Sequence, residues 1–271
     1  MKGHEMGMTF WKMSGAGNDF IMVDGRNRES GPIHREMIAE LCARGLSVGA
    51  DGLIEILGSR GAAFMMRYYN SDGGRAEMCG NGARCICRFA AHLDLVPMNG
   101  EFLFESDAGI HRGIVLSDTE ARIWTTEPRV HWLERPLSDP PGLVASFLDT
   151  GVPHCVVFAG DMEDGSFEEL APLVRRSLDM GEAGANADWV MVQPDGSLSM
   201  RTWERGVEGE TLACGTGAVA SALAAAEIFE NVTLPVEIRV RSGRTLTVGR
   251  DHSGWWLQGE ARIVYRGELL P

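Results

Sequence analysis

A short phrase occurs twice in this sequence, half a chain apart, and it constrains the fold more than any other feature. Cys79-Gly80-Asn81-Gly82-Ala83 returns 135 residues later as Cys214-Gly215-Thr216-Gly217-Ala218. A Met-Arg pair precedes each copy, at residues 66–67 and 200–201. Two weaker echoes have a similar spacing: residues 15–18 with 151–154, and residues 50–52 with 187–189. This order predicts two equivalent halves, with their cysteines on opposite walls of one cleft.

The bulk composition fits a globular protein of two domains. The chain has 271 residues, and its apolar fraction of 44% is sufficient for a hydrophobic core. The formal charge of −13 argues against nucleic acid or an anionic membrane as a partner. No apolar run approaches the ~20 residues of a membrane span, and the first ten residues do not resemble a signal peptide. Six cysteines are too few for a disulfide scaffold, so we expect a cytoplasmic protein with reduced thiols.

The shortage of lysine bears on the chemistry. The sequence contains two lysines, Lys2 and Lys12, against 23 arginines. Enzymes that use pyridoxal phosphate hold it as a Schiff base on a lysine, but Lys2 belongs to the terminal tail and Lys12 to an expected strand. The phosphate-loop motif and the His-Glu-x-x-His zinc helix are also missing from the sequence. We therefore expect no cofactor and no metal.

The pattern of apolar residues predicts strands and helices in both halves. Turn residues separate short apolar and β-branched runs, which is typical of strands. These runs are 20–23, 53–57, 64–69, 102–105, 113–116, 122–125, 155–158, 189–192, 198–203, 236–240, 245–248, 255–258 and 261–265. Residues 32–44 and 167–177 have the pattern of surface helices.

The segments after the two cysteine motifs, residues 83–93 and 218–229, are apolar nearly all round. A helix with so little polar surface is buried. We therefore predict an α/β (α+β) fold of two pseudo-symmetric halves, each a mixed β-sheet or barrel wrapped around a central helix. Four prolines, at positions 128, 136, 140 and 141, mark the crossover between the halves. The predicted domains are residues 1–126 and 127–261.

Each repeated cysteine precedes a Gly-x-Gly turn that opens a predicted buried helix. A helix N-terminus leaves backbone N–H groups unpaired and carries a partial positive charge. Such a site lowers the pKa of a thiol and binds a carboxylate. With Cys79 and Cys214 facing one substrate, one thiolate could remove an α-proton and the opposite thiol could return one. The expected chemistry is racemisation or epimerisation without a cofactor.

A simpler interpretation exists for each residue taken alone. A single free cysteine is more often a buried structural residue, and we keep that interpretation for Cys42, Cys85, Cys87 and Cys155. The spacing of Cys85 and Cys87 does not match zinc ligands. The polar residues close to the motifs could equally belong to turns, to strand ends or to the core: Asn18, Asn70, His154, Glu204 and Arg205. The paired occurrence of Cys79 and Cys214 favours catalysis.

Taken together, these motifs resemble the diaminopimelate epimerase family over essentially the whole chain. The resemblance rests on residues 14–20, 70–73, 79–85, 151–155, 186–187, 204–206 and 209–218. It implies a pyridoxal-independent isomerase that converts L,L-diaminopimelate to the meso form in lysine and cell-wall precursor synthesis. It also implies that a final strand, residues 262–271, returns to complete the first half.

The resemblance also implies a role for each site residue. Cys79 would act on the L centre and Cys214 on the D centre. The reacting end of the substrate would be held by Asn18 and by backbone groups of Gly80, Asn81, Gly215 and Thr216. His154 and Glu204 would lie near its amino group, while Asn70, Asn186 and Arg205 would read the distal end. The partner is then a small amino acid, with no nucleic acid and no membrane, and a homodimer is left open as the assembly.

The chain departs from the family pattern at a few positions. Val152 stands where many relatives have asparagine, so one amide expected to contact the distal end is missing. Gly52 replaces a common glutamine, and Thr216 replaces a frequent serine. We therefore hypothesise that binding of the distal end of the substrate depends more strongly on Asn70, Asn186 and Arg205 than it would with an amide at position 152.

Three other functions stay open on sequence grounds. The first is a different pyridoxal-independent racemase or epimerase of the same fold, of the proline or histidine type, which a substrate panel would distinguish. The second is a non-catalytic binding protein, although binding alone needs no paired thiols. The third is a redox protein that uses Cys79 and Cys214 as a dithiol. Isomerase turnover under fully reducing conditions would decide against the third.

Overall fold

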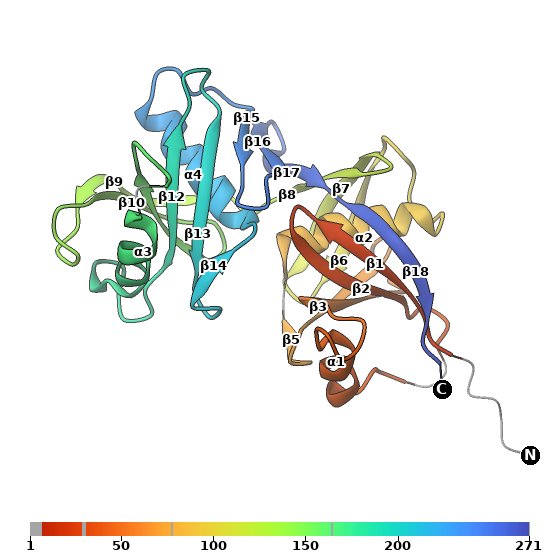
Figure 1. The fold of residues 1–271 in the computed structure, drawn as a ribbon. Helices are drawn as coiled ribbons and strands as arrows, with labels where there is room; N and C mark the ends of the chain where they lie inside the picture. The colour runs from red at the N-terminus through yellow and green to blue at the C-terminus, as the bar shows by residue number, and fades with distance from the viewer. Residues whose placement is uncertain (1–6, 29–30, 77, 164, 271) are drawn as a thin grey trace, which may run out of the picture. The chain divides into compact units, whose positions relative to one another are not determined.

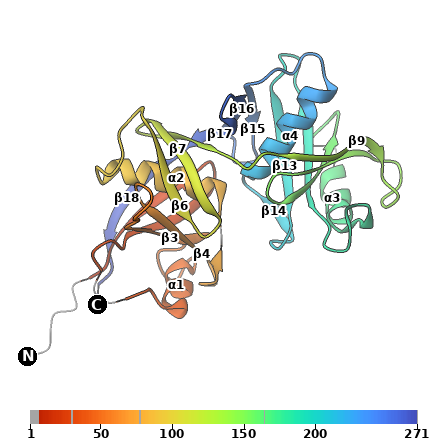
Figure 2. The same cartoon turned by 180° about the vertical axis from the view of Figure 1, so that it is seen from behind.

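A computed structural model describes residues 7–28, 31–76, 78–163 and 165–270, which form two compact units (Figures 1 and 2). The first unit runs to Ile123 and resumes at Gly259, and the second spans Trp124–Gln258. The boundaries expected after residues 126 and 261 thus lie three residues beyond the observed ones. Lys2 lies outside the described residues.

The first unit is a mixed sheet with two helices. Its sheet order is β18-β1-β2-β3-β4-β6-β7-β8, with the short β5 paired to β4. The pairs β2–β3 and β4–β6 are parallel, and the others are antiparallel. The elements are β1 (Thr9–Gly15), β2 (Asn18–Asp24), α1 (Arg35–Cys42), β3 (Gly52–Leu57), β4 (Met65–Asn70), β5 (Arg75–Ala76), α2 (Gly80–His92), β6 (Glu101–Ser106), β7 (Gly109–Ser117), β8 (Glu120–Trp124) and β18 (Arg262–Glu268).

The second unit repeats this topology strand for strand. Its order is β9-β10-β11-β12-β13-β15-β16-β17, with β14 on β13, and the pairs β11–β12 and β13–β15 are parallel. The elements are β9 (Arg129–Pro136), β10 (Val144–Asp149), β11 (Pro153–Phe158), α3 (Ser166–Arg176), a 3-10 turn (Leu178–Met180), β12 (Asn186–Val192), β13 (Leu198–Glu204), β14 (Gly209–Thr211), α4 (Gly215–Ile228), β15 (Val236–Arg239), β16 (Thr245–Asp251) and β17 (Gly254–Glu260).

The helices that follow the cysteine motifs are the central helices of the two units. In Figure 1, α2 and α4 each lie among the strands of their own unit and pack against them. Most of α4 is buried, because small and apolar residues make up nearly the whole helix. The smaller helices α1 and α3 connect the parallel pairs β2–β3 and β11–β12. The two-half fold expected from the repeat is therefore confirmed.

The pairing register defines which residues are equivalent in the two units. Phe20 pairs with Gly52 in the first unit, and His154 pairs with Asn186 in the second. Together with the repeated Met-Arg pair, this register makes Phe20 the counterpart of His154 and Ile54 the counterpart of Asp188. The glycine contacts agree: a Cβ at Gly82 would meet Ile54, and a Cβ at Gly217 would meet Asp188.

This register differs from the echoes in the sequence, which matched Asp51 with Asp188 and Asn18 with His154. The length of the connection between the paired strands does not explain the difference, because the step from Phe20 to Gly52 and the step from His154 to Asn186 both span 32 residues. The echoes of Asn18 in His154 and of Asp51 in Asp188 are therefore similarities of sequence at positions that are not structurally equivalent.

The proline-rich middle of the chain holds more structure than the expected crossover. Residues 129–149 form the hairpin of β9 and β10, which pairs at the edge of the second unit. Most side chains of β9 are exposed, so its sequence has no alternating apolar pattern to indicate a strand. At the corresponding edge of the first unit, β18 pairs antiparallel with β1, as the resemblance implied.

Candidate active site

Cys79 lies at the N-terminus of α2, where its backbone is extended (φ −141°, ψ 120°) and caps the helix. Its carbonyl oxygen accepts the N–H of Ala83 at 2.7 Å, and its side chain is partly exposed. Gly82 permits close packing here, since a Cβ at that position would lie 2.7 Å from Cδ1 of Ile54. The first turn of α2 thus presents a thiol beside backbone N–H groups that have no partner within the helix.

A chain of amide and guanidinium side chains lies beside Cys79. Arg84 donates to Oδ1 of Asn81 at 2.7 Å, and Nδ2 of Asn81 donates to Oδ1 of Asn18 at 2.5 Å. Asn18 in turn donates to Oδ2 of Asp51 at 2.9 Å. The structure therefore brings together Asn18 and Asn81, both predicted to hold the reacting end, and fixes the orientation of their amides.

Arg84 is a feature of this site to which the sequence argument gave no role. Its side chain is fully buried, and burial lowers the pKa of its guanidinium. Among the described residues its hydrogen-bond partners are the Asn81 amide and, at 3.5 Å, the Gly80 carbonyl, while Nε has none. An arginine between alanine and cysteine in an apolar helix was the available signal. The buried guanidinium belongs to a residue five positions after Cys79.

Cys214 occupies the same position on α4, with an extended backbone (φ −124°, ψ 112°), but its surroundings differ. Its side chain is buried, and Sγ lies 3.4 Å from Oγ1 of Thr216. Burial raises the pKa of the Cys214 thiol, and the carboxylates of Glu204 and Asp188 raise it further. The lowered pKa expected at a helix N-terminus is therefore not found at Cys214, because burial and like charge outweigh the helix end.

His154 connects Cys214 to a buried carboxylate. Nε2 of His154 lies 3.0 Å from Oγ1 of Thr216, and Nδ1 lies 2.7 Å from Oδ2 of Asp188. The other carboxylate oxygen of Asp188 accepts the hydroxyl of Thr202 at 2.7 Å. Both His154 and Asp188 are fully buried. The ring of His154, predicted to lie near the substrate's amino group, is engaged inside its own unit at both nitrogens.

The residues predicted to read the distal end lie at strand ends. Asn186 begins β12, and its Oδ1 accepts the backbone N–H of Arg205 at 2.7 Å. Arg205 follows β13, is half-buried, and forms no ion pair within the described part of the chain. Glu204 ends β13 as Asn70 ends β4, at the equivalent position in the register. The side chain of Asn70 is exposed and does not bond to the other predicted site residues.

Two sequence features proved to have structural explanations. Lys12 is buried and forms an ion pair with Asp19 at 2.6 Å, so its amine is committed to that contact. At Gly52, an added Cβ would lie 2.7 Å from the ring of Tyr68 and 2.4 Å from the carbonyl oxygen of Tyr69. The position where relatives carry glutamine is therefore closed to a side chain here.

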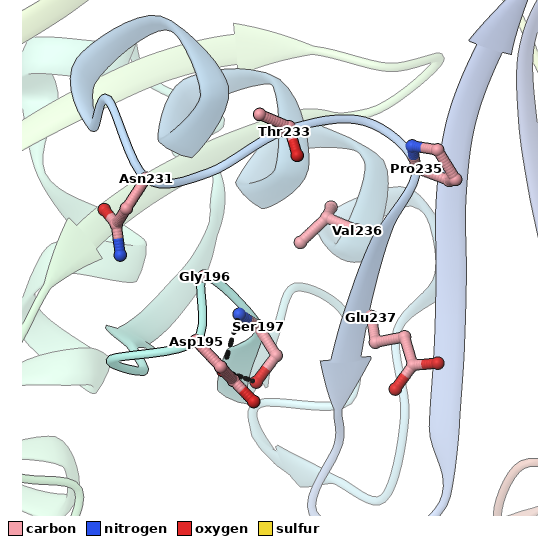
Figure 3. Close-up of a pocket in the computed structure, with 8 residues that line it drawn as sticks. All are labelled: Asp195, Gly196, Ser197, Asn231, Thr233, Pro235, Val236 and Glu237. Carbon is pink, nitrogen blue, oxygen red and sulfur yellow. Dashed lines mark hydrogen bonds between the residues drawn. The ribbon is translucent and has the colours of Figure 1, made fainter.

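The second unit also has a shallow pocket, shown in Figure 3, at the end of α4 opposite Cys214. It lies between the turn before β13 and the segment that precedes β15, with Ser197 donating to Asp195 at 2.7 Å. No His, Cys or Arg lines it. A 14-residue helix separates this pocket from the cysteine motif, so it is not part of the candidate site.

Within the described ranges, no group of three or more His, Cys, Asp or Glu side chains is arranged to hold a metal ion. No helix in that same part of the chain is long and apolar enough to cross a membrane.

The fold is that of solved isomerases and related proteins. A hydroxyproline epimerase from Agrobacterium vitis, solved with bound trans-4-OH-L-proline, superposes with a TM-score of 0.70 at 14% identity, over 98% of this chain and 93% of that one. A phenazine biosynthesis protein of the PhzF family from Bacillus anthracis gives 0.71 at 16% identity, over 97% and 99%. The architecture thus falls in the fold class shared by these proteins, with one central helix per half.

Sequence comparison defines the family within that class. The diaminopimelate epimerase family model matches residues 10–131 and 146–264. Diaminopimelate epimerase of Chlorobaculum tepidum is 37% identical over 95% of this chain and 99% of that protein, and that of Aquifex aeolicus is 35% identical over 97% and 98%. The chain belongs to the diaminopimelate epimerase family.

Proposed function

We propose that this protein converts L,L-diaminopimelate to meso-diaminopimelate at one α-carbon, without pyridoxal phosphate. The observation that carries the proposal is the repeated cysteine motif, which gives each unit one cysteine at the N-terminus of its buried helix. Binding or structural roles do not need such a matched pair. Membership of the family supports diaminopimelate as the substrate.

In the proposed reaction the Cys79 thiolate removes the α-proton from the L centre. The Cys214 thiol then delivers its proton to the opposite face of the same carbon, which leaves Cys79 as the thiol and Cys214 as the thiolate. Backbone N–H groups at Gly80, Asn81, Gly215 and Thr216 would hold the substrate carboxylate. They stabilise the negative charge that develops on its oxygens as the α-proton leaves.

Asn18 supports this role because its orientation is fixed by the Arg84–Asn81 chain on one side and by Asp51 on the other. For the distal end, the Arg205 guanidinium has no carboxylate partner among the residues that the structure describes, which suits bidentate binding of the second carboxylate. Asn186 positions the Arg205 backbone and Asn70 supplies an exposed amide, while Glu204 would lie near the reacting amino group.

The cellular setting belongs to the same proposal. We place the reaction in lysine and peptidoglycan precursor synthesis in the cytoplasm, with a free amino acid as the partner and neither nucleic acid nor membrane. The formal charge of −13 and the reduced cysteines support this setting. Light scattering would show whether the protein is a homodimer.

The first test is proton NMR of the purified, reduced protein with L,L-diaminopimelate in D₂O, without added cofactor. We expect the α-proton signal to disappear as meso product forms, and Cys79→Ala and Cys214→Ala each to abolish that conversion. Folded, reduced protein that exchanges no α-proton of diaminopimelate would reject the proposal. Proline and histidine would then be tested as substrates.

A further inference from the structure

The second unit contains a continuous line of hydrogen-bonding atoms that starts at the thiol of Cys214. Sγ lies 3.4 Å from Oγ1 of Thr216, and that hydroxyl lies 3.0 Å from Nε2 of His154. Nδ1 of the same ring lies 2.7 Å from Oδ2 of Asp188. All four residues belong to one unit, on α4, β11 and β12. The line ends at a carboxylate that is itself fully buried.

The donors along this line follow from the partners. An ionised carboxylate only accepts, so Asp188 takes its hydrogen bond from Nδ1–H of His154. Nε2 is then an acceptor, and Nδ2 of Asn186, which can only donate, also approaches it at 3.4 Å. The hydroxyl of Thr216 therefore donates to Nε2, and its oxygen is left to accept the S–H of Cys214. Thr202 holds the other oxygen of Asp188.

We propose that Thr216, His154 and Asp188 form a proton relay for Cys214. The S–H proton passes to the oxygen of Thr216 while the hydroxyl proton of Thr216 passes to Nε2 of His154. The products are a thiolate at Cys214 and an imidazolium at His154, next to the Asp188 carboxylate. The reverse transfer restores the thiol. Thr216 touches Cys214 directly, and His154 and Asp188 act through it.

The surroundings of Cys214 explain why a relay is needed. Two carboxylates face this thiol, Asp188 on β12 and Glu204 on β13, and both disfavour a second negative charge. Because the side chain is only 7% exposed, bulk water is a poor route for its proton. Transfer to His154 keeps the proton within the buried group, and Asp188 stabilises the imidazolium that forms. In the proposed reaction Cys214 must change between thiol and thiolate.

The described strands of the first unit do not repeat this line of residues, although their topology is the same. The counterparts of His154 and Asp188 in the pairing register are Phe20 and Ile54, which cannot carry a proton. Cys79 has instead the buried guanidinium of Arg84 five residues along its helix. A fixed cation favours thiolate, whereas an Asp-His pair allows both states. This contrast locates the relay at Cys214 alone.

The test compares Thr216→Val with Thr216→Ser. Valine keeps the shape of threonine without the hydroxyl, and serine keeps the hydroxyl. The reduced full-length proteins are treated with iodoacetamide, without substrate, across the neutral to alkaline range. Peptide mass spectrometry then gives the alkylation rates of Cys79 and Cys214 separately. Because this readout needs no turnover, it is independent of which amino acid the enzyme uses.

We expect Thr216→Val to slow alkylation of Cys214 near neutral pH by about tenfold or more, the loss of one intramolecular base. Cys79 should react at the wild-type rate in the same sample, and Thr216→Ser should restore most of the rate at Cys214. Asp188→Asn should also slow Cys214, since the imidazolium then loses its neighbouring charge.

The relay is overturned if Cys214 reacts in Thr216→Val as in wild type, if Thr216→Ser is as slow as Thr216→Val, or if both cysteines slow together. The proposed relay depends on the proposed function only in that Cys214 is taken to exchange a proton with the α-carbon of the substrate. Absence of α-proton exchange with normal relay behaviour would reject the substrate alone. Epimerisation with a relay-negative result would reject the relay alone.

Discussion

At the scale of single residues, two equivalent glycines have unequal neighbours. A Cβ at Gly217 would lie 2.6 Å from Oδ1 of Asp188, and a Cβ at Gly82 would lie 2.7 Å from Cδ1 of Ile54. The isoleucine methyl is the end of a flexible side chain and can rotate away. Asp188 cannot, because Thr202 and His154 hold both of its oxygens.

This difference predicts unequal effects of the same substitution. Gly217→Ala should displace Asp188 and thereby misalign His154. We expect kcat to fall by roughly 10²-fold, because misplacements of about 1 Å can cost that much in rate. Gly82→Ala should have a much smaller effect. Steady-state kinetics of the two purified variants, with circular dichroism to show that both are folded, makes the comparison. Equal losses of kcat in the two variants would contradict the idea that Asp188 is held in place while Ile54 can move.

Arg205 is the residue on which distal recognition should depend most. Val152 removes one amide expected at the distal end, and the Arg205 guanidinium has no carboxylate partner among the described residues. Arg205→Ala should therefore raise KM for diaminopimelate by about tenfold or more, with a smaller change in kcat, since truncating a charged partner costs binding energy. An unchanged KM would remove Arg205 from substrate recognition. Arg135→Ala, on β9, is a matched control.

The sequence singled out residues whose type suggests a role, and missed those whose importance comes from their burial. The repeat singled out Cys79 and Cys214, because two cysteines at matched positions are improbable by chance. It gave no role to Arg84 or Thr202, and it noted Asp188 only as an echo of Asp51. Whether a charged side chain is enclosed, and by what, depends on strand register, which nothing in a local motif specifies.

At the scale of elements, a group of ion pairs ties β1, β2 and the loop after α1. Lys12 on β1 and Arg44 after α1 both pair with Asp19 on β2, and Arg44 also pairs with Asp51 at 2.7 Å. Burial would raise the pKa of the Asp19 carboxyl, but hydrogen bonds and charge from Arg44 and Lys12 hold it below its ordinary 3.8. Asp51 in turn orients Asn18.

The lowered pKa of Asp19 predicts a pH-dependent stability. Its contribution is present above the unfolded pKa near 3.8 and is lost as pH falls through the lower folded value. Between neutral pH and pH well below 3.8, the unfolding free energy of wild type should therefore fall more than that of Asp19→Asn. Urea unfolding at the two pH values measures both proteins. Parallel losses would show that Asp19 carries no such contribution.

Most elements could be predicted from the sequence because their apolar patterns are local. The four predicted helices and the strand runs correspond to observed elements, with ends displaced by a few residues. The edge hairpin of β9 and β10 was missed, because the exposed side chains of β9 carry no apolar pattern and the prolines of this region indicated a crossover. The two-residue β5 and the three-residue β14 are too short to show an apolar sequence pattern. What defines these strands is the neighbour they pair with, which lies elsewhere in the sequence.

At the scale of the whole molecule, the same order of paired strands occurs in both units, and each unit has its own hydrophobic core. The buried cluster around Trp189 and Phe167 lies in the second unit, and that around Ile38 and Leu53 lies in the first. The repeated motif predicted this duplication, since the same motif at matched positions indicates the same local fold in both halves. It could not predict how far the interiors differ, because a ladder of backbone hydrogen bonds accepts phenylalanine as readily as histidine.

The exchange of Phe20 and Ile54 for His154 and Asp188 has a consequence for kinetics. An enzyme cannot alter the equilibrium ratio of two diastereomers, so the Haldane relation ties the forward and reverse specificity constants together. The individual maximal rates and Michaelis constants remain free to differ. In the proposed reaction two chemically unlike thiols act on the same carbon, so each direction can have its own slow step. The final mixture is set by the diastereomers alone.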